Sequence, residues 1–262
     1  MKFGYQVGSY PTKSETWIVN EIKGLRAASH DVLVNCVHSG DKESLANCDF
    51  IVCHFAVNAG FADRFKKPFV LIPHAYDIWP TNGRYLKAAI RDCRNLQAIG
   101  CVSSYHRERY LGWGIDESLL VDWPCAIDDS LFYPADTIGD LVIAGGRNVP
   151  KKGFDLTLKA WPTVTLFGDH PDAIGWLQPS DLAYLMRQSR CFLGTFVADD
   201  KGDMDGLPIS VLEAGAVGLQ VVTTKVAGLR DLEGMVIFAS EDADDIREKV
   251  ASAPKKPNTK LR

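Results

Sequence analysis

The sequence predicts an α/β protein made of two Rossmann-like domains whose parallel sheets face a central cleft. Short apolar, β-branched runs alternate with helical patterns along the 262 residues, which is typical of βαβ units. The alternation breaks at the polar segment FYPADTIGD, residues 132–140, and then restarts. We therefore expect an N-terminal domain over residues 1–135, a C-terminal domain over residues 139–252 and a flexible basic tail over residues 253–262.

The first domain is expected to contain six strands separated by helices. Its first helix has a start signal at Ser14, followed by an apolar stripe at helical spacing formed by Trp17, Ile18, Ile22 and Leu25. The expected strands are Lys2–Gly8, Asp31–Val37, Phe50–Phe55, Phe69–Pro73, Ile99–Ser103 and Leu119–Trp123, with helices near 14–29, 58–66, 80–97 and 104–113.

The second domain repeats the pattern with five strands. Ligands of such parallel sheets bind beyond the carboxyl ends of the strands, so the loops there are the places to look for a site. The expected strands are Leu141–Ala144, Val164–Phe167, Cys191–Phe196, Gln220–Thr224 and Met235–Phe238, with helices over 153–161, 180–189, 208–217 and 241–251.

Composition excludes several classes of protein. A net charge of −4 gives no general attraction to nucleic acid, so no nucleic-acid partner is expected. The seven cysteines are scattered without a CxxC pair, which indicates reduced thiols rather than disulfides. No histidine pairs with cysteine or carboxylate at metal-ligand spacing, and no segment has the pattern expected of a signal peptide or a membrane span. We expect a cytoplasmic protein without a metal site or cofactor.

The first candidate site is a glycine-rich turn with two cations. A strand runs into Gly145 and Gly146, then Arg147 and Lys152 follow, and Gly153 opens a helix. Glycines allow backbone N–H groups to approach a ligand. The forked guanidinium of Arg147 and the compact ammonium of Lys152 suit the oxygens of a diphosphate. A solvated basic turn is the alternative. The GxGxxG and P-loop patterns are absent, so neither a dinucleotide nor a P-loop site is supported.

The second candidate site is the segment DMDGLPISVLE. Asp205, Gly206 and Leu207 precede Pro208, which suits the first turn of a helix, and Glu213 lies about one turn further on. Free N–H groups at the helix start can hold phosphate oxygens, while each carboxylate can bind a pair of sugar hydroxyls.

This segment allows three other interpretations. Asp203 and Asp205 match a metal-binding DxD pattern, but no context of that fold surrounds them. An EF-hand loop fails because its first and twelfth positions would be Lys201 and Leu212. A glycosidase acid/base pair is possible, although the helix start and the upstream basic loop favour a phosphate ligand.

Taken in order, the motifs resemble the GT4 family of GT-B glycosyltransferases over nearly the whole chain. The segment YPTKSETWIVNEIKGLRAASHDVLV resembles the family's N-terminal strand–helix signature, and IPHAYDIWP resembles its histidine-containing loop. GGRNVPKKGFDLTLKA and DGLPISVLEAGAVGLQVVTTKVAGLRDL resemble the donor-binding segments, the second of which ends in an E-x7-E signature in the family. The chain departs from that signature by carrying aspartate at its first position, and it is shorter than typical members.

The resemblance implies roles for four C-terminal residues. Arg147 and Lys152 match the pair that contacts the donor diphosphate and stabilises it as a leaving group. Glu213 matches the glutamate that binds the nucleotide ribose. Asp205 stands where the family has the glutamate that contacts donor-sugar hydroxyls.

The resemblance also implies a loop and one N-terminal residue. Gly206, Leu207 and Pro208 fall in the loop whose amides approach the phosphates, and His74 matches the histidine that contacts the transferred sugar. Read without the family, a lone histidine after a strand is more often structural. Members of the family typically retain the anomeric configuration and need no metal.

The sequence therefore predicts a retaining, metal-independent glycosyltransferase with a nucleotide-sugar donor. Two alternatives remain: a non-catalytic GT-B module that binds nucleotide or glycan, and an epimerase of the donor sugar. The acceptor is a glycan, a lipid-linked glycan or a small molecule. Peripheral membrane contact through Arg84, Lys87, Arg91 and Arg94 competes with a plain solvated helix face.

Overall fold

Two compact units make up the computed structural model, which describes residues 1–40, 42–134 and 139–261. Unit 1 comprises Met1–Ala126 together with Lys201–Gly206, and unit 2 comprises Ile127–Asp200 together with Leu207–Arg262. Each unit is an α/β body built on a parallel sheet, which confirms the predicted pair of Rossmann-like domains. Residues 135–138 of the expected linker lie outside the described residues.

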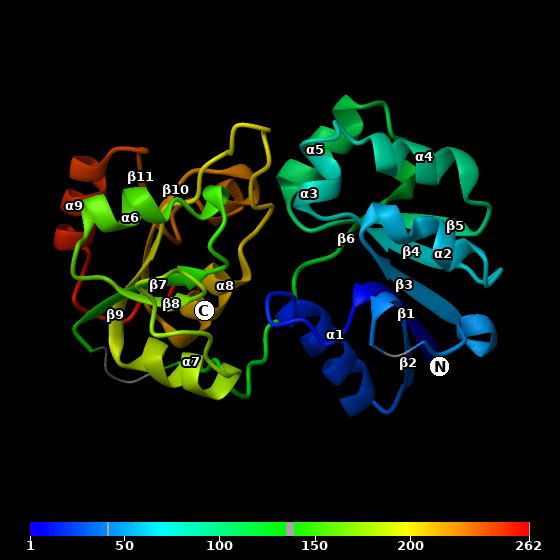
Figure 1. Cartoon of the computed structure of the whole chain (residues 1–262), viewed down its shortest axis with the longest axis horizontal. Coiled ribbons are helices and arrows are strands. Elements are labelled where there is room, and N and C mark those ends of the chain that lie inside the picture. The colour runs from blue at the N-terminus through cyan, green and yellow to red at the C-terminus, as the bar shows by residue number, and fades with distance from the viewer. Residues whose placement is uncertain (41, 135–138, 262) are drawn as a thin grey trace. The chain divides into compact units, whose positions relative to one another are not determined.

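Unit 1 is built on a parallel sheet with the strand order β2-β1-β3-β4-β5-β6 (Figure 1). The chain adds β2 on one side of β1 and all later strands on the other. The strand order therefore reverses between β1 and β3, and such a switch point is where open α/β sheets bind ligands. The strands are β1 (Lys2–Ser9), β2 (Asp31–Ser39), β3 (Phe50–His54), β4 (Phe69–Ile72), β5 (Leu96–Cys101) and β6 (Leu120–Asp122).

Helices cover both faces of this sheet (Figure 1). Ile18 and Ile22 of α1 are buried in one apolar cluster with Val7 and Val34 of the sheet. The opposite face buries side chains of the other helices against β3, β4 and β5. These helices are α2 (Ala59–Asp63), α3 (Ala75–Ile78), α4 (Arg84–Asp92) and α5 (Ser104–Gly112), while α1 spans Thr16–Ala27.

Unit 2 repeats the design with the strand order β11-β10-β9-β7-β8. Its order reverses between β7 and β9, so the second switch point lies where these two strands end. The strands are β7 (Leu141–Gly146), β8 (Thr165–Gly168), β9 (Ser189–Gly194), β10 (Gln220–Thr224) and β11 (Ile237–Ala239).

Two apolar layers enclose the unit 2 sheet. One layer buries residues of α6 (Phe154–Ala160) and α9 (Ala243–Ser252), and the other buries residues of α7 (Pro179–Arg187) and α8 (Ile209–Val217). Figure 1 shows α6 beside α9 on one side of the sheet and α7 on the other. No helix in the described ranges is long and apolar enough to span a membrane.

The helix predicted over 80–97 has the wrong bounds at both ends. It runs only from Arg84 to Asp92, and residues 96–97 belong to strand β5. The cause is the Asp63 carboxylate, whose Oδ1 accepts hydrogen bonds from the backbone of Arg94 at 3.0 Å and of Asn95 at 2.9 Å. These bonds turn the chain out of the helix and into the sheet, so Arg94 is not on the basic face of α4.

Two other start signals differ from their expected form. Helix α1 begins at Thr16 with Glu15 as its N-cap and no side-chain capping bond, so Ser14 does not cap it. Pro208 is the N-cap of α8 rather than its first residue. The short helix α3 was not predicted, since it depends on the Asp77 carboxylate accepting the backbone N–H of His74 at 2.8 Å.

The segment expected to be a flexible tail makes defined contacts with unit 2. Asn258 donates from its backbone to the Gly218 carbonyl at 2.7 Å and from its side chain to the Met235 carbonyl at 2.8 Å. The Gln220 amide donates to the Lys256 carbonyl at 2.8 Å, and Leu261 packs on the apolar layer that includes α8. Residues 253–261 thus cover part of this layer.

Candidate active site

The predicted glycine turn lies at the switch point of unit 2. Gly145 and Gly146 are the last residues of β7, next to β9 in the sheet. A Cβ at Gly145 would lie 2.5 Å from the Phe167 ring, so the strand can end this close to β8 only with glycine. Gly146 has a φ of 134°, a conformation that side chains avoid. The last two residues of β7 therefore add no side chain of their own to this edge of the sheet.

The two predicted cations leave this turn together. Arg147 is exposed directly after β7, and Lys152 ends the short 3-10 helix η4 (Pro150–Lys152). Lys152 folds back so that its Cε lies 3.4 Å from the position of a Cβ on Gly146, and its Nζ lies 4.9 Å from the centre of the Phe196 ring. The structure thus places both cations beside the glycine turn, with Lys152 packed against Gly146 and Phe196 and Arg147 exposed.

Two polar contacts shape the cationic loop. The backbone N–H of Asn148 donates to the Asp169 carboxylate, which follows β8. The Thr195 hydroxyl, which follows β9, donates to the Gly153 carbonyl at 2.8 Å. Sequence reasoning missed Asp169 and Thr195, which directly follow β8 and β9 at the edge where ligands bind; Thr195 lay inside the predicted strand Cys191–Phe196.

Glu213 is the most unusual charged residue of unit 2. It lies on α8 with only 3% of its surface exposed, and burial raises its pKa to about 7. Within the described residues, no hydrogen-bond donor or cation contacts its carboxylate, and burial is the sole cause of the shift. A buried carboxylate normally has such partners, so Glu213 has hydrogen-bond acceptors that the described residues leave unused.

The remaining loop residues divide between the two units. Asp205 and Gly206 group with unit 1, where Gly206 approaches His106 so closely that a Cβ would lie 2.6 Å from the imidazole Cε1. Leu207 and Pro208 group with unit 2, in which Leu207 packs on the same apolar layer as α8. The structure therefore joins Gly145, Gly146, Arg147, Lys152, Leu207, Pro208 and Glu213 in one unit, and places His74, Asp205 and Gly206 in the other.

In unit 1, His74 follows β4 and caps α3. Its ring lies between aromatic neighbours, with ring centres 4.6 Å from Phe55 and 5.2 Å from Trp17. Desolvation is the largest cause that holds the pKa of His74 well below its ordinary value, and the nearby His54 and His106 add to it. The imidazole is therefore neutral at pH 7. Sequence reasoning missed its ring partner His54, because a histidine inside an apolar strand resembles an ordinary core residue.

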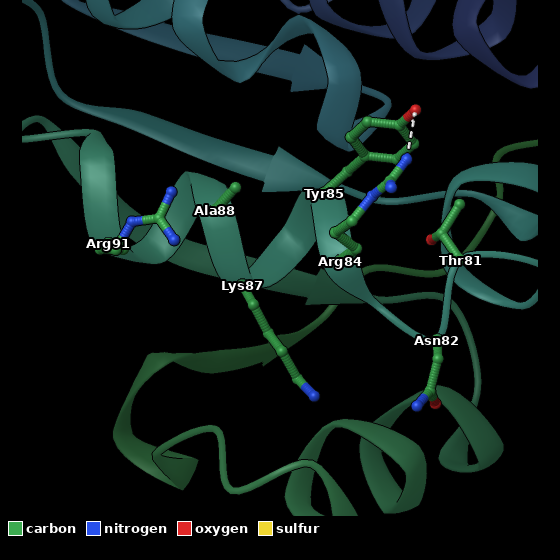
Figure 2. A pocket seen from close by; sticks show the side chains of 7 residues that line it. All are labelled: Thr81, Asn82, Arg84, Tyr85, Lys87, Ala88 and Arg91. Atoms are coloured by element: carbon green, nitrogen blue, oxygen red, sulfur yellow. Dashed lines mark hydrogen bonds between the residues drawn. The ribbon is translucent and has the colours of Figure 1, made fainter.

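A basic hollow lies elsewhere on unit 1, over helix α4. It has a volume of about 570 Å³, and Figure 2 shows Arg84, Lys87 and Arg91 reaching it from the helix. Arg84 donates to the Tyr85 hydroxyl at 3.2 Å, and Lys87 lies over the Trp113 ring at 5.5 Å. The other lining residues are Thr81, Asn82 and Ala88. Three of the four cations predicted for membrane contact thus line one hollow.

Comparison with known proteins identifies the second half of the chain. Residues 140–262 match the family described as "Glycosyl transferases group 1". This part of the chain is similar to the group 1 glycosyltransferases. The chain is a glycosyltransferase, with the glycine turn, both cations and Glu213 inside the matched range. No curated protein sequence matches it.

Solved structures of the GT-B fold resemble this glycosyltransferase over its full length. HepE from Anabaena, solved with UDP and glucose, is 14% identical with a TM-score of 0.73, and the match covers 100% of this chain and 93% of HepE. Sucrose-phosphate synthase from Thermosynechococcus elongatus is 13% identical with a TM-score of 0.74, at the same coverage of 100% and 93%.

A third resemblance extends to a different activity. A UDP-N-acetylglucosamine 2-epimerase is 12% identical with a TM-score of 0.55, and the match covers 97% of this chain and 88% of that protein. At these identities the comparisons establish the GT-B fold alone, so the site residues have to carry the finer assignment.

Proposed function

We propose that this glycosyltransferase is a retaining, metal-independent member of the GT4 family that moves a sugar from a nucleotide-diphosphate sugar to an acceptor hydroxyl. The observation that carries the proposal is Glu213, a residue only 3% exposed whose carboxylate receives no hydrogen bond within the described residues. The two adjacent hydroxyls of a ribose would supply the missing donors. The role that the family resemblance implies for Glu213 therefore matches what its surroundings lack.

Arg147 and Lys152 are proposed to hold the donor diphosphate. Both leave the glycine turn at the switch point between β7 and β9, the usual ligand edge of such a sheet. The nine-residue helix α8, which carries Glu213, adds unsatisfied N–H groups at its start after Leu207 and Pro208. Two cations and these amides can neutralise the charge that develops on a departing diphosphate, which is the chemical reason for proposing independence from metal.

His74 and Asp205 are proposed to contact the transferred sugar, as the family resemblance implies. A neutral imidazole and a carboxylate both form hydrogen bonds with sugar hydroxyls. Asp205 is one methylene shorter than the glutamate of the family, so it is the position at which we expect the choice of sugar to differ. Retention is tested by the anomeric configuration of the product, and metal independence by activity that survives a chelator.

The donor assignment is tested by a thermal-shift panel of UDP, GDP, ADP and dTDP with their sugar conjugates. A ligand at 100 times its Kd adds about 2.7 kcal/mol of stability, which raises the Tm of a unit this size by roughly 5–10 °C. Glu213→Gln should abolish the shift. Glu248→Gln, which changes an exposed glutamate of α9, is the matched control and should retain it.

The competing functions give different outcomes in the same preparations. A non-catalytic module would bind a nucleotide but would neither transfer the sugar nor slowly hydrolyse the donor. An epimerase would convert the donor sugar with no acceptor present. Transfer to an acceptor with retained configuration supports the proposal, and failure of every nucleotide to shift the Tm would contradict it.

We further propose a cytoplasmic location and contact with an anionic membrane surface through the hollow over α4. The support for contact is the cluster of Arg84, Lys87 and Arg91 in a protein of net charge −4. A lipid-linked glycan acceptor would be reached at such a surface. The wild-type protein should pellet with vesicles that contain about 30% phosphatidylserine. The variant in which Arg84, Lys87 and Arg91 are all replaced by glutamate should stay in the supernatant. Equal pelleting of both would remove this proposal.

A further inference from the structure

A buried chain of hydrogen bonds runs behind His74. Glu21 lies on α1, His54 is the last residue of β3 and His74 follows β4. The Glu21 carboxylate lies 3.2 Å from Nε2 of His54, and Nδ1 of His54 lies 3.1 Å from Nε2 of His74. The two imidazole rings are nearly parallel, with an angle of 16° between their planes. Three side chains from separate elements thus form one polar line at the switch point of unit 1.

The glutamate end of this line fixes the direction of its hydrogen bonds. Oε2 of Glu21 also lies 3.2 Å from the Tyr5 hydroxyl, and Oε1 lies 3.2 Å from Nε1 of Trp123. An indole nitrogen can only donate, and an ionised carboxylate can only accept. Because the carboxylate offers acceptors alone, Nε2 of His54 must carry a proton.

The proton on Nε2 of His54 also determines which imidazole donates in the hydrogen bond between His54 and His74. An imidazole that carries its one proton on Nε2 has a lone pair on Nδ1, which accepts the hydrogen of Nε2 on His74 across the 3.1 Å contact. A neutral His74 has a single ring proton, so its Nδ1 is left as an acceptor. His54 is fully buried and the Glu21 side chain is only 10% exposed, so little water reaches the line to supply an alternative partner.

The backbone conformation of the residue after His54 is strained, and it places an aromatic ring against His74. Phe55, directly after His54, has a φ of 70°, which is unfavourable for an aromatic residue. In this conformation the Phe55 ring lies 4.6 Å from the ring of His74, and Trp17 lies on another side at 5.2 Å. The rings limit rotation of His74 and keep its Nε2 directed at His54.

We propose that Glu21 and His54 are positioning residues that hold His74 as the neutral tautomer with its proton on Nε2. The other nitrogen, Nδ1, is then an acceptor, on the side of the ring where the backbone N–H of Asp77 meets the His74 side chain, and a sugar hydroxyl there would donate to it. The link to the sugar depends on the proposed function, whereas the assignment of the tautomer stands on unit 1 alone. Neither Glu21 nor His54 touches the sugar in this scheme.

The tautomer is measured by NMR of protein labelled with ¹⁵N-histidine, at pH 7.5 and without ligand. Long-range ¹H–¹⁵N spectra distinguish a protonated ring nitrogen from a bare one, and His54→Asn and His74→Asn assign the two signals. The expected result is a proton on Nε2 and a bare Nδ1 in both residues. A proton on Nδ1 of His74, or an even mixture of tautomers, overturns the proposal even if the enzyme transfers sugar.

Two variants test the positioning role. In Glu21→Gln the amide NH₂ must face one of the three donors, which allows both histidines to move their protons to Nδ1. Tyr5→Phe is the matched control, because it removes a donor to the same carboxylate and leaves both histidines unaltered. We expect Glu21→Gln to change the NMR tautomer signals and Tyr5→Phe to leave them unchanged.

Kinetics separate positioning from simple loss of structure. Glu21→Gln should lower kcat roughly 10- to 100-fold, by analogy with the loss of the outer hydrogen-bond partner of a metal-binding histidine, with KM for the donor within about twofold. Tyr5→Phe should keep both constants. Equal kcat in both variants would overturn the positioning role. If the wild-type protein transfers no sugar at all, the proposed function fails, and the NMR result still decides the tautomer.

Discussion

Replacing Glu213 with glutamine should make the folded protein more stable at pH 8 while it abolishes nucleotide binding. Most substitutions of buried residues destabilise a protein, so a gain in stability combined with a loss of binding is a specific signature of a functional carboxylate. The expectation follows from the burial of Glu213, which is 3% exposed and whose carboxylate has no hydrogen-bond partner within the described residues.

The magnitude comes from the raised pKa. Glu213 has a pKa of about 7 in the folded protein against an ordinary value of 4.5. One pKa unit corresponds to 1.36 kcal/mol, so burial of the ionised form costs roughly 3 kcal/mol. Because the folded-state pKa is raised, the cost is absent below about pH 4.5, where Glu213 is protonated in both the folded and the unfolded state. The free energy of unfolding then falls as the pH rises from 4.5 towards 7, and it stays at the lower value above pH 7. A glutamine escapes the cost of the charge but still buries an amide, so we expect a gain of about 1–3 kcal/mol at pH 8.

The assay is urea unfolding of wild type and Glu213→Gln at pH 5 and pH 8. The gain should appear at pH 8 and nearly vanish at pH 5, where the wild-type carboxyl is already protonated in the folded state. Glu248→Gln controls for the loss of one negative charge and should match wild type at both pH values. A Glu213→Gln protein that is less stable than wild type at pH 8 would refute the reasoning, because Glu213 would then have a stabilising partner.

Three further outcomes follow from the site. Nucleoside diphosphate binding should release about half a proton at pH 7 and almost none at pH 9, since ribose hydroxyls favour the ionised Glu213; calorimetry in buffers of different ionisation heat measures this. Gly145→Ala should cost roughly 1–3 kcal/mol in urea unfolding, because its Cβ would lie 2.5 Å from the Phe167 ring; a loss under about 0.5 kcal/mol would contradict the packing argument. Asp205→Glu should change the preferred donor sugar in competition assays and leave the affinity for the bare nucleotide unaltered, whereas a changed nucleotide affinity would contradict its assignment to the sugar.

Most strands were predictable because they are short apolar runs that their neighbours bury. The helix predicted over 80–97 shows why such patterns can misplace the end of an element. Its sequence continues to favour a helix past Asp92, but Asp63, about thirty residues away, accepts the backbone bonds that end it. Long-range capping of this kind leaves no local signal. Helix α3 was missed for the same reason, since it depends on Asp77, which also accepts a hydrogen bond from the backbone of Ala56.

The candidate site was predictable in unit 2 and less so in unit 1. The glycine turn, Arg147 and Lys152 are close in sequence, and the sheet order places their strand end at a switch point. The grouping of Asp205 and Gly206 with unit 1 could not be read from their neighbours in the chain. The line from Glu21 through His54 to His74 joins residues 20 to 53 positions apart, and only the pairing of β3 with β4 and the packing of α1 bring them together.

The central claim is that the two cations at the glycine turn hold the diphosphate of a nucleotide sugar. Its most direct test is calorimetric titration of the nucleotide sugar chosen by the thermal-shift panel into wild type, Arg147→Ala and Lys152→Ala. Lys159→Ala, which removes an exposed lysine from α6, is the matched control. We expect each cation at the turn to contribute roughly 10-fold or more in affinity, its loss to abolish measurable transfer, and the control to match wild type. Unchanged affinity and turnover in both Arg147→Ala and Lys152→Ala would contradict the account.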